Sequence, residues 1–399
     1  MRVLTISNQE ELKKIMRDIG VDPYGIKLML PKAKMYLVKL NSLSNISANI
    51  LKQEMLSLGG EVALARGALT GKVKKTGCLI MATLAQLDRL NEKLSKQPFG
   101  LGGLSRELST AVKNYQKEKF VLNLGNYKLK LGKRSYIMAI LNLTPDSFSH
   151  DGIYSLGSIA HISQIEARAR KLVEDGADII DLGGESSRPQ AKPVSVKEEL
   201  SRVIPVIKIL AKKIKVPISI DTRKPEIAKA ALDNGALMVN DISGLRDRRM
   251  AKIVSRYNAG VVIMHMQGEP GSMQKNPRYA SLMDEIIGYL SCAIKEALDT
   301  GIARDKIVID PGIGFGKTLD HNLEILRKLK ELKVLGQPIL IGTSRKAFIG
   351  KILGSKVNER IFGTLSSCIL AVKNGANILR VHDIKPIKQA LAVLDSVER

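Results

Sequence analysis

The chain has 399 residues, which leaves room for a smaller domain beside a barrel of about 250 residues. Its hydrophobic fraction of 44% is typical of a globular protein, and no apolar run reaches the roughly 18 residues of a membrane helix. The net charge of +24 favours either an anionic partner, such as a nucleic acid or a phosphorylated small molecule, or a lysine-rich surface that promotes solubility.

The cysteines and the aromatic residues narrow the class of protein further. Cys78, Cys292 and Cys368 are far apart and form no CxxC pair, which argues against a disulfide framework and against a cysteine zinc site. The first residues, MRVLTISNQEELKKIM, lack the apolar core of a signal peptide, so we expect a cytoplasmic protein. With nine Tyr, six Phe and no Trp, the chain has few side chains for stacking on bases, and nucleic-acid binding is the less favoured alternative.

The first 134 residues mix helical and strand-like patterns without a repeat. The predicted elements are a short amphipathic helix, a strand, a helix that stops at glycine, and a strand that runs into a helix, at residues 8–19, 33–40, 48–60 and 76–97. Residues 127–136 are expected to carry the junction, as a short strand that caps the bottom of the next domain. We therefore predict a smaller α+β domain over residues 1–134.

Eight short apolar runs recur from residue 135 onward, with helical patterns between them. They occupy residues 135–144, 177–184, 217–222, 237–243, 260–266, 306–312, 338–344 and 378–383. Apolar runs without polar alternation indicate strands covered on both faces, hence a parallel sheet. Residues 197–214 show helical spacing, although Pro205 weakens that prediction. Eight strand–helix units predict an α/β fold, a (β/α)₈ TIM barrel over residues 135–399.

Polar residues end most of the predicted strands, and in such barrels the active site lies at these ends. There are two kinds of strand-end residue, and the first kind comprises Asp221, Asn240 and Asp310. Singly, each could cap a helix or hold a turn. Together, buried carboxylates cost several kcal/mol unless they are paired, so they predict a ligand rich in N–H donors. The edge of a 2-amino-4-oxo pyrimidine ring fits, and Lys346 could donate to its carbonyl group or to a ring nitrogen.

A second kind of strand-end residue supplies hydrogen-bond donors and positive charge that suit an anion. These residues are Ser187, Arg188, Ser344, Arg345, Arg380 and His382. Asn142 is a weak metal ligand by itself, but beside a diphosphate it could hold Mg²⁺ together with phosphate oxygens and water.

Two other motifs are discounted. The run GIGFGKT at residues 312–318 lacks the spacing of a phosphate-binding Walker loop. His265 has no histidine or carboxylate at metal-ligand spacing, so we interpret it as a pocket wall or a core residue. No convincing nucleophilic triad is present in the sequence.

Seven segments of the barrel resemble, in order, the signature segments of dihydropteroate synthases, a family of pterin-binding TIM barrels. They are MAILNLTPDSFS, GADIIDLGGESSRP, ISIDTRK, VNDISG, IVIDPGIGFGKTLDHNLEIL, GTSRKAFIG and RVHD. One such segment would be weak support, but seven in the right order are specific. The first 134 residues are similar to extensions of some family members, and a structural, oligomerisation or regulatory role is expected for them.

The resemblance implies a transferase that joins 6-hydroxymethyl-7,8-dihydropterin diphosphate to 4-aminobenzoate and releases diphosphate. It also implies Mg²⁺ as cofactor and a homodimer. The residues that match the family's catalytic positions are Asp221, Lys346 and Arg380. Those that match its pterin-binding positions are Asp221, Asn240, Asp310, Lys346 and Arg380.

The resemblance assigns two further sets of residues. The diphosphate set comprises Asn142, Ser187, Arg188, Arg380 and His382, and Asn142 is also its metal ligand. The arylamine set comprises Ser187, Arg188, Pro189, Phe315, Ser344 and Lys346, together with Ala347.

Departures from the family pattern leave the arylamine open. His150 stands where many members have aspartate, Ser187 where threonine is usual, and Ala347 where serine is common. A ribosylated aminobenzene phosphate, as in the methanopterin pathway, is one alternative to 4-aminobenzoate. A methyltetrahydrofolate–corrinoid methyltransferase is another, although it has no diphosphate to hold. A basic scaffold that binds nucleic acid through residues 1–134 is the alternative outside enzymes.

Overall fold

The chain folds into two compact units, Met1–Lys113 and Asn114–Arg399, and each is described by itself. The computed structural model describes residues 1–6, 8–143, 159–186, 193–269 and 271–398. The second unit begins before the predicted boundary at residue 134. The reason is a hairpin ahead of the barrel, whose apolar side chains pack into the barrel's own core.

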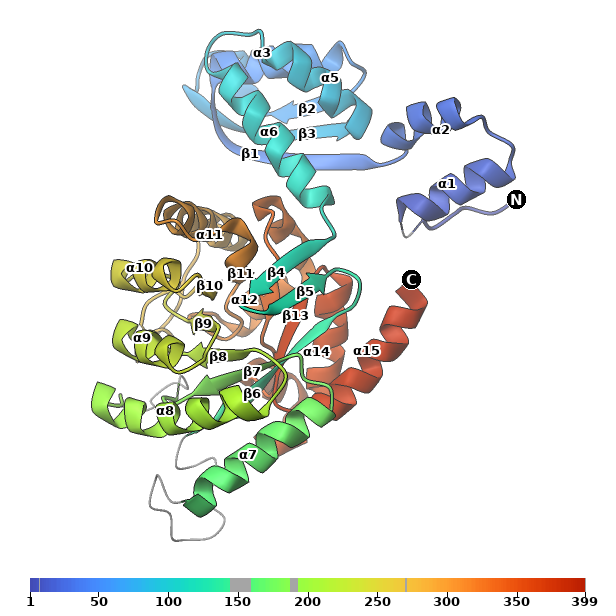
Figure 1. Cartoon of the computed structure of the whole chain (residues 1–399). Helices are drawn as coiled ribbons and strands as arrows, with labels where there is room; N and C mark the ends of the chain where they lie inside the picture. Colours follow the sequence, from blue (N-terminus) through green and yellow to red (C-terminus); the bar gives the residue numbers. More distant parts are fainter. Residues whose placement is uncertain (7, 144–158, 187–192, 270, 399) are drawn as a thin grey trace. The chain divides into compact units, whose positions relative to one another are not determined.

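The first unit has the α+β character that its mixed patterns predict. Its sheet is antiparallel, in the order β1-β3-β2, with strands β1 (Met35–Ser44), β3 (Lys75–Thr83) and β2 (Glu61–Leu64). Helices α3 and α5 lie along this sheet (Figure 1). The helices of the unit are α1 (Gln9–Asp18), α2 (Pro23–Met29), α3 (Asn45–Leu56), α4 (Arg66–Leu69), α5 (Leu84–Leu94) and α6 (Leu101–Gln116), the last of which runs into the second unit.

The second unit contains the predicted barrel. Seven neighbouring strand pairs are parallel, and a parallel bridge between Ile309 and Ile339 closes the ring between β11 and β12. The strands are β6 (Tyr136–Asn142), β7 (Ile179–Gly183), β8 (Ile218–Asp221), β9 (Met238–Asp241), β10 (Gly260–Met264), β11 (Ile307–Asp310), β12 (Leu340–Ile341) and β13 (Ile378–Val381). The prediction of eight parallel strands is confirmed.

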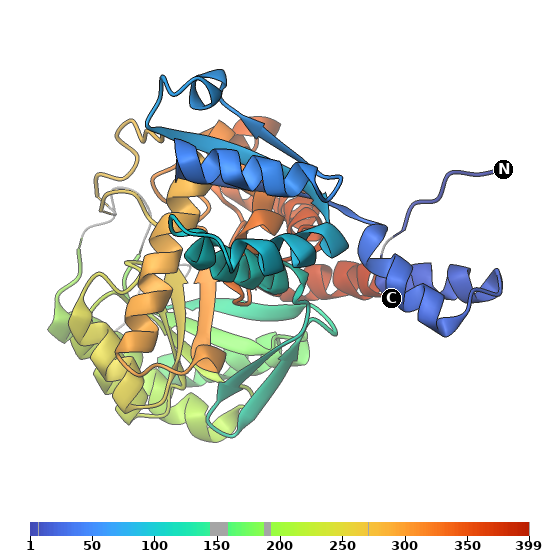
Figure 2. The same ribbon diagram turned by 90° about the horizontal axis from the view of Figure 1, so that it is seen from above.

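Helices follow the strands and surround them, as the two views show (Figures 1 and 2). They are α7 (Ile159–Glu174), α8 (Val196–Lys213), α9 (Pro225–Asp233), α10 (Arg248–Arg256), α11 (Leu282–Asp299), α12 (Leu319–Lys328), α13 (Ala347–Leu353), α14 (Ile361–Lys373) and α15 (Ile384–Glu398). None of the helices among the described residues has the length and apolarity that a membrane crossing requires.

Helix α8 illustrates how local sequence sets an element. The side chain of Ser195 caps its start by accepting the Glu198 N–H, and acidic residues in the first turn and lysines in the last suit the helix dipole. The helix continues through Pro205, so the proline does not end it. Buried Val203 and Ile207 belong to the core shared with the strands, which stabilises the helix from one side.

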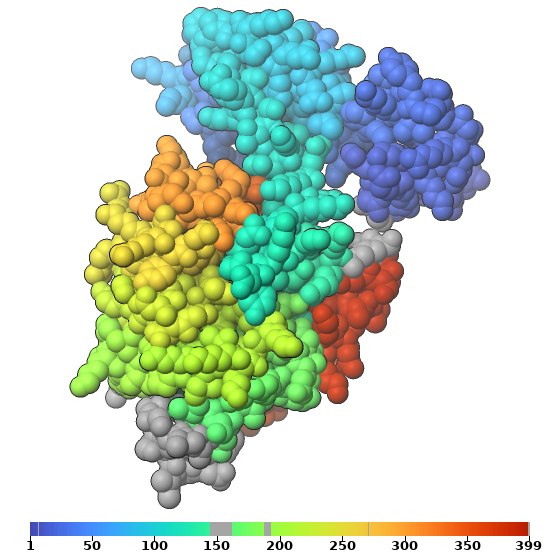
Figure 3. All heavy atoms as spheres, in the orientation of Figure 1, coloured from blue at the N-terminus to red at the C-terminus, as the bar shows by residue number. Residues whose placement is uncertain are grey.

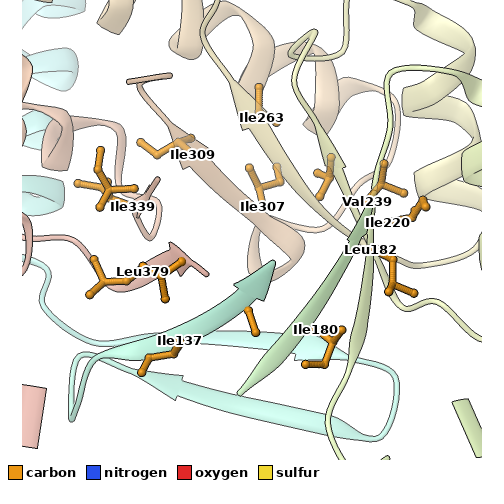
Figure 4. Close-up of a cluster of buried hydrophobic side chains, with 14 of the residues drawn as sticks. Ile137, Ile180, Leu182, Ile220, Val239, Ile263, Ile307, Ile309, Ile339 and Leu379 are labelled. Atoms are coloured by element: carbon orange, nitrogen blue, oxygen red, sulfur yellow. The ribbon is translucent and has the colours of Figure 1, made fainter. Parts of the chain in front are cut away.

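Alternating side chains along each barrel strand face opposite sides. One set packs against the helices and builds the main core (Figure 4). The labelled members are Ile137, Ile180, Leu182, Ile220, Val239, Ile263, Ile307, Ile309, Ile339 and Leu379. The alternate set points into the barrel, and its lower layer is Met138, Ile179, Met238, Val262, Val308, Leu340 and Ile378.

An antiparallel hairpin, β4 (Phe120–Leu124) and β5 (Tyr127–Leu131), closes the amino-terminal end of the barrel. Phe120, Leu122 and Leu124 belong to the same buried cluster as the lower layer. In the space-filling view the hairpin, in teal, lies directly against the neighbouring part of the same unit (Figure 3). The expected strand near residues 127–136 is thus present, paired with a second strand that the sequence did not reveal.

Replacing Gly260 by alanine should lower the free energy of unfolding by about 1–3 kcal/mol, because the new Cβ would collide with Leu124 Cδ2. Urea denaturation measures the change. Gly288→Ala on α11 is the matched control, since a Cβ there meets nothing within 4 Å. That change should stabilise the protein by about 0.5–1 kcal/mol. Equal effects of the two changes would show that the hairpin does not pack tightly against β10.

Candidate active site

The inward-facing set of side chains changes from apolar to polar towards the carboxyl ends of the strands. In four of the strands, the residue two positions after the lower-layer residue is polar, and it points into the barrel as well because side chains alternate along a strand. These residues are Asp181, Asn240, Asp310 and Arg380. Asp221, at the end of β8, lies beside Asn240 in the strand register. The structure therefore gathers the predicted pterin-binding residues at one end of one barrel.

Arg380 is the centre of this cluster. Its Nε donates to Asp181 Oδ2 over 2.6 Å, and its Nη2 donates to Asp221 Oδ2 over 2.5 Å. Asn240 Nδ2 donates to the same Asp181 oxygen over 3.1 Å. One guanidinium thus connects the second and third strands of the barrel, β7 and β8, with the last strand, β13. Because a guanidinium is planar, these bonds also fix its orientation.

Asp181 is a member of this cluster that the sequence analysis does not identify. It lies in the middle of the apolar run ADIIDLGG and not at the strand end, so the pattern of polar strand ends does not include it. Its signal was a lone charged residue in an otherwise apolar strand. The side chain is fully buried, and Oδ1 has no hydrogen-bond partner among the described residues. A buried carboxylate with an unused oxygen offers a place for a donor from a ligand or a water.

The charges of this cluster influence one another strongly. Burial raises the pKa of Asp221 to about 7; Arg380 opposes the rise, while Asp181 adds to it. Burial disfavours the charged form of Arg380, but Asp181 and Asp221 outweigh it and raise the pKa of the guanidinium above its ordinary value. Arg380 therefore stays charged, and Asp221 can change its protonation state near neutral pH.

Asp310 and Lys346 form the opposite side of the cluster. Asp310 Oδ1 accepts the N–H of Gly312 over 2.7 Å, and burial raises the pKa of the carboxyl group. Burial and then the charge of Arg380 lower the pKa of Lys346 to about 8. The Lys346 ammonium lies 4.1 Å from the centre of the Phe315 ring, a cation–π geometry. Two predicted arylamine-binding residues are thus in contact.

Ser344 and His382 join the two last strand ends. Ser344 Oγ lies 3.0 Å from His382 Nδ1 and accepts the His382 backbone N–H over 3.2 Å. Burial, with Arg380 and Arg345 nearby, lowers the pKa of His382 to about 3. His382 is therefore neutral at physiological pH, so it can donate to an anion through one ring N–H but brings no positive charge.

Arg345 is expected to donate to an anionic ligand, but in the structure its guanidinium is paired with a carboxylate of the protein. Its guanidinium forms two bonds to Asp383, of 3.0 and 2.5 Å. Its φ of +57° is strained for a residue with a side chain, and the conformation is held by Thr364 Oγ1, which accepts the Arg345 N–H over 3.0 Å. Arg345 thus shapes the turn that leads into Lys346, and Ala347 is exposed at the start of α13.

Asn142 lies at the end of β6 and faces the same region. A Cβ built on Gly183 would lie 3.4 Å from Asn142 Oδ1 and 3.9 Å from Asp221 Oδ2. Both oxygens therefore border one position, and glycine at 183 keeps that position clear.

Ser187, Arg188 and Pro189, like His150, lie outside the described residues. The chain on both sides of 187–192 is described, and Lys224 holds it. Lys224 Nζ donates to Val194 O over 2.6 Å and to Glu199 Oε2 over 2.6 Å, and it lies 3.0 Å from Glu185 Oε2. One half-buried lysine thus ties together the two ends of the segment that carries the three predicted residues.

Comparisons with known proteins agree with this geometry. Residues 138–382 match the family model described as "Pterin binding enzyme". The dihydropteroate synthase of Synechocystis sp. is 44% identical over 281 residues, which cover 70% of this chain and 95% of that protein.

A match from Halobacterium salinarum includes the amino-terminal unit. The probable bifunctional folylpolyglutamate synthase/dihydropteroate synthase of that organism is 35% identical over 98% of this chain, which corresponds to 46% of that protein. The crystal structure of Xanthomonas albilineans dihydropteroate synthase with 4-aminobenzoic acid has a TM-score of 0.65 and 39% identity, covering 70% of this chain and 98% of that one. The chain belongs to the dihydropteroate synthase family of pterin-binding enzymes.

Proposed function

We propose that the carboxyl end of this barrel joins 6-hydroxymethyl-7,8-dihydropterin diphosphate to 4-aminobenzoate, with release of diphosphate and formation of 7,8-dihydropteroate. The observation that carries the proposal is the cluster of Asp181, Asp221 and Asp310 with Arg380 and Lys346, buried at one barrel end in a member of this family. Three carboxylates and two cations suit a ligand that has both N–H donors and anionic groups.

The carboxylates and the carboxamide support a pterin site. Asp310 uses one oxygen for Gly312 N–H and keeps the other for the ring's exocyclic amine and N–H edge. Asn240 gives its amide N–H to Asp181, which leaves its carbonyl oxygen for the ring. Lys346 would donate to the ring carbonyl, and Arg380 would lie against the ring between the pterin and the diphosphate.

Asn142 is the proposed protein ligand of Mg²⁺. The described residues contain no group of three or more His, Cys, Asp or Glu side chains that could hold a metal by themselves. The Asn142 oxygen is of the hard kind that Mg²⁺ accepts, and this ion commonly takes one or two protein oxygens and completes its coordination with phosphate and water. When bound, Mg²⁺ would neutralise charge on the departing diphosphate.

Departure of diphosphate leaves a cation at the exocyclic methylene group, which the electron-rich dihydropterin stabilises. Arg380 adds a fixed positive charge for the leaving group, while His382 and Ser344 add neutral donors. The neutral arylamine then forms the C–N bond and loses its proton, so a strong general base is not needed. We assign the arylamine to Phe315 and Lys346, and from the family resemblance to Ser187, Arg188 and Pro189.

Release of diphosphate tests the proposal. The protein is given the dihydropterin diphosphate with Mg²⁺ and either 4-aminobenzoate, its ribosylated phosphate analogue, or no amine. We expect stoichiometric diphosphate and dihydropteroate with 4-aminobenzoate. Turnover with the ribosylated amine alone would move the enzyme to the methanopterin pathway. No turnover with either amine, but methyl transfer from methyltetrahydrofolate to a corrinoid, would instead identify the methyltransferase.

The rate should fall as the pH rises through about 8, because burial holds the pKa of Lys346 near that value and the neutral amine is a weaker hydrogen-bond donor than the charged ammonium. The lysine side chain is charged below its pKa and neutral above it, so the loss is on the alkaline side. The measurement is kcat/KM for the dihydropterin diphosphate between pH 6 and 10. Lys346→Arg, which does not titrate in this range, should move the alkaline limb upward. An unmoved limb would contradict the role of Lys346.

We also propose a homodimer formed through helices α14 and α15, which contact each other. Phe362, Val393 and Val397 are exposed to 77%, 67% and 77%, an unusual set of large apolar side chains on one helix pair. Sedimentation equilibrium tests this, with Phe362→Asp as the variant expected to be monomeric.

A cytoplasmic location is proposed as well, because Cys78, Cys292 and Cys368 are free.

A further inference from the structure

The loop after β11 is held by side chains at three successive carbonyl groups. Gln274 Nε2 donates to Gly314 O over 2.6 Å, Lys317 Nζ to Phe315 O over 3.0 Å, and Tyr279 Oη to Gly316 O over 2.8 Å. Gln274 and Tyr279 come from the segment that follows β10, whereas Lys317 ends the loop itself. Such a row of bonds fixes the backbone on both sides of Phe315.

The glycines of this loop show how tightly it packs. Gly312 and Gly316 have φ values of +72° and +62°, which glycine adopts without strain. A Cβ on Gly312 would collide with His265 O, and one on Gly316 would lie 2.5 Å from Gln267 O. The loop therefore lies directly against the backbone that leaves β10, without room for a side chain between them.

Lys317 bonds to both of the segments that meet here, the loop after β11 and the backbone that follows β10. Only 3% of the residue is exposed, and its ammonium reaches Phe315 O at 3.0 Å, His265 Nδ1 at 3.0 Å and His265 O at 3.4 Å. Burial, together with the charge of Lys317, lowers the pKa of His265 to about 3, so the ring is neutral and Nδ1 can accept. Burial lowers the pKa of Lys317 to about 7, while Asp310 opposes the change. In its charged form the three N–H groups of the ammonium meet three acceptors.

The fixed loop determines where the Phe315 ring lies. The ring packs in a small buried cluster with Met264, Met266 and Met273, and the Lys346 ammonium lies over it at 4.1 Å. Because methionine side chains adapt their shape easily, they would not hold the ring in one position by themselves. The backbone bonds of the loop are therefore needed to set its place.

We propose that Lys317 is a positioning residue that holds Phe315 as a wall of the arylamine site and thereby sets the affinity for the arylamine. The inference rests on the proposed function, because it takes Phe315 to contact the arylamine. It gives a role to a buried lysine whose ammonium bonds to Phe315 and His265, and to His265, which is confirmed as a buried residue with a satisfied ring nitrogen.

Lys317→Met tests the inference by separating two binding steps. We expect KM for 4-aminobenzoate to rise at least about tenfold, because small misplacements at a reacting centre cost large factors. The dissociation constant of 6-hydroxymethyl-7,8-dihydropterin should stay within about twofold. Lys306→Met is the matched control, since Lys306 is 6% exposed and precedes the same strand at its other end. It should change neither constant.

Other outcomes would overturn the role. An unchanged KM for 4-aminobenzoate excludes positioning of the arylamine wall. A parallel loss of pterin affinity would show that Lys317 acts by its charge on Asp310. If Lys317→Met does not fold, Tyr279→Phe removes one bond of the same loop and should raise the same KM by a smaller factor.

Hydrogen exchange keeps the inference testable apart from the proposed function. In Lys317→Met the amides of Gly314 and Phe315 should exchange faster than in the wild-type protein, and in Lys306→Met they should not. Absence of this change would overturn the role of Lys317. If the wild-type protein made no dihydropteroate but exchange still changed, the proposed function would fail while the structural role of Lys317 remained.

Discussion

Replacing Asp310 by asparagine is expected to weaken pterin binding by a large factor while the fold is kept. The carboxylate holds one oxygen on Gly312 N–H and offers the other to the ring edge, and asparagine would turn an NH₂ group toward the ring's own donors. Loss of hydrogen bonds to a charged acceptor costs about 2–4 kcal/mol, which is a roughly 30- to 1,000-fold weaker affinity.

Calorimetric titration with 6-hydroxymethyl-7,8-dihydropterin measures this change. The matched control is Asp241→Asn, one residue after Asn240. Asp241 is buried but lies on the other face of β9, where it accepts from Ser243 and Leu245 N–H groups. Its replacement should lower stability and leave pterin affinity nearly unchanged. Normal affinity in Asp310→Asn would show that the ring does not lie at Asp310.

Arg380→Lys should lower kcat/KM for the dihydropterin diphosphate by about 10²- to 10³-fold. The guanidinium bonds Asp181 and Asp221 through two different nitrogens, and an ammonium on a flexible chain cannot reproduce this planar bridge. The loss leaves one carboxylate buried without its counter-charge, so that carboxylate takes up a proton instead.

Steady-state kinetics of the variant with saturating 4-aminobenzoate checks this expectation. Arg134→Lys is the matched control, because Arg134 also forms a two-bond pair, with Asp178, before the first barrel strand. It should lower stability without changing kcat/KM. An Arg380→Lys enzyme with wild-type kinetics would remove Arg380 from the proposed catalytic set.

Most of the barrel could be predicted from the sequence, because strands buried on both faces are apolar throughout and end at polar residues. Which polar residues meet in the buried cluster depends on which side chains of each strand point into the barrel. An apolar run does not show this, because its residues are apolar on both faces. Asn240 and Asp241 are adjacent and both polar, yet only Asn240 points into the barrel. The position of each strand in the closed sheet decides this, and sequence spacing alone does not.

The residues whose environment the sequence does not show are those whose partners lie far away in the chain. Asp181 matters because Arg380, 199 residues later, donates to it. Arg345 is paired with Asp383, and burial keeps His382 neutral, so neither residue brings an unpaired positive charge to this end of the barrel. The resemblance predicts the positions, but only the fold shows which charges are already paired.

A crystal structure with 6-hydroxymethyl-7,8-dihydropterin diphosphate and Mg²⁺ tests the assignment most directly. We expect the pterin edge within hydrogen-bond distance of Asp310 and Asn240, Arg380 between the ring and the diphosphate, and Asn142 on the metal. A ring bound outside the carboxyl end of the barrel, or one bound there without contact to Asp310, would contradict it.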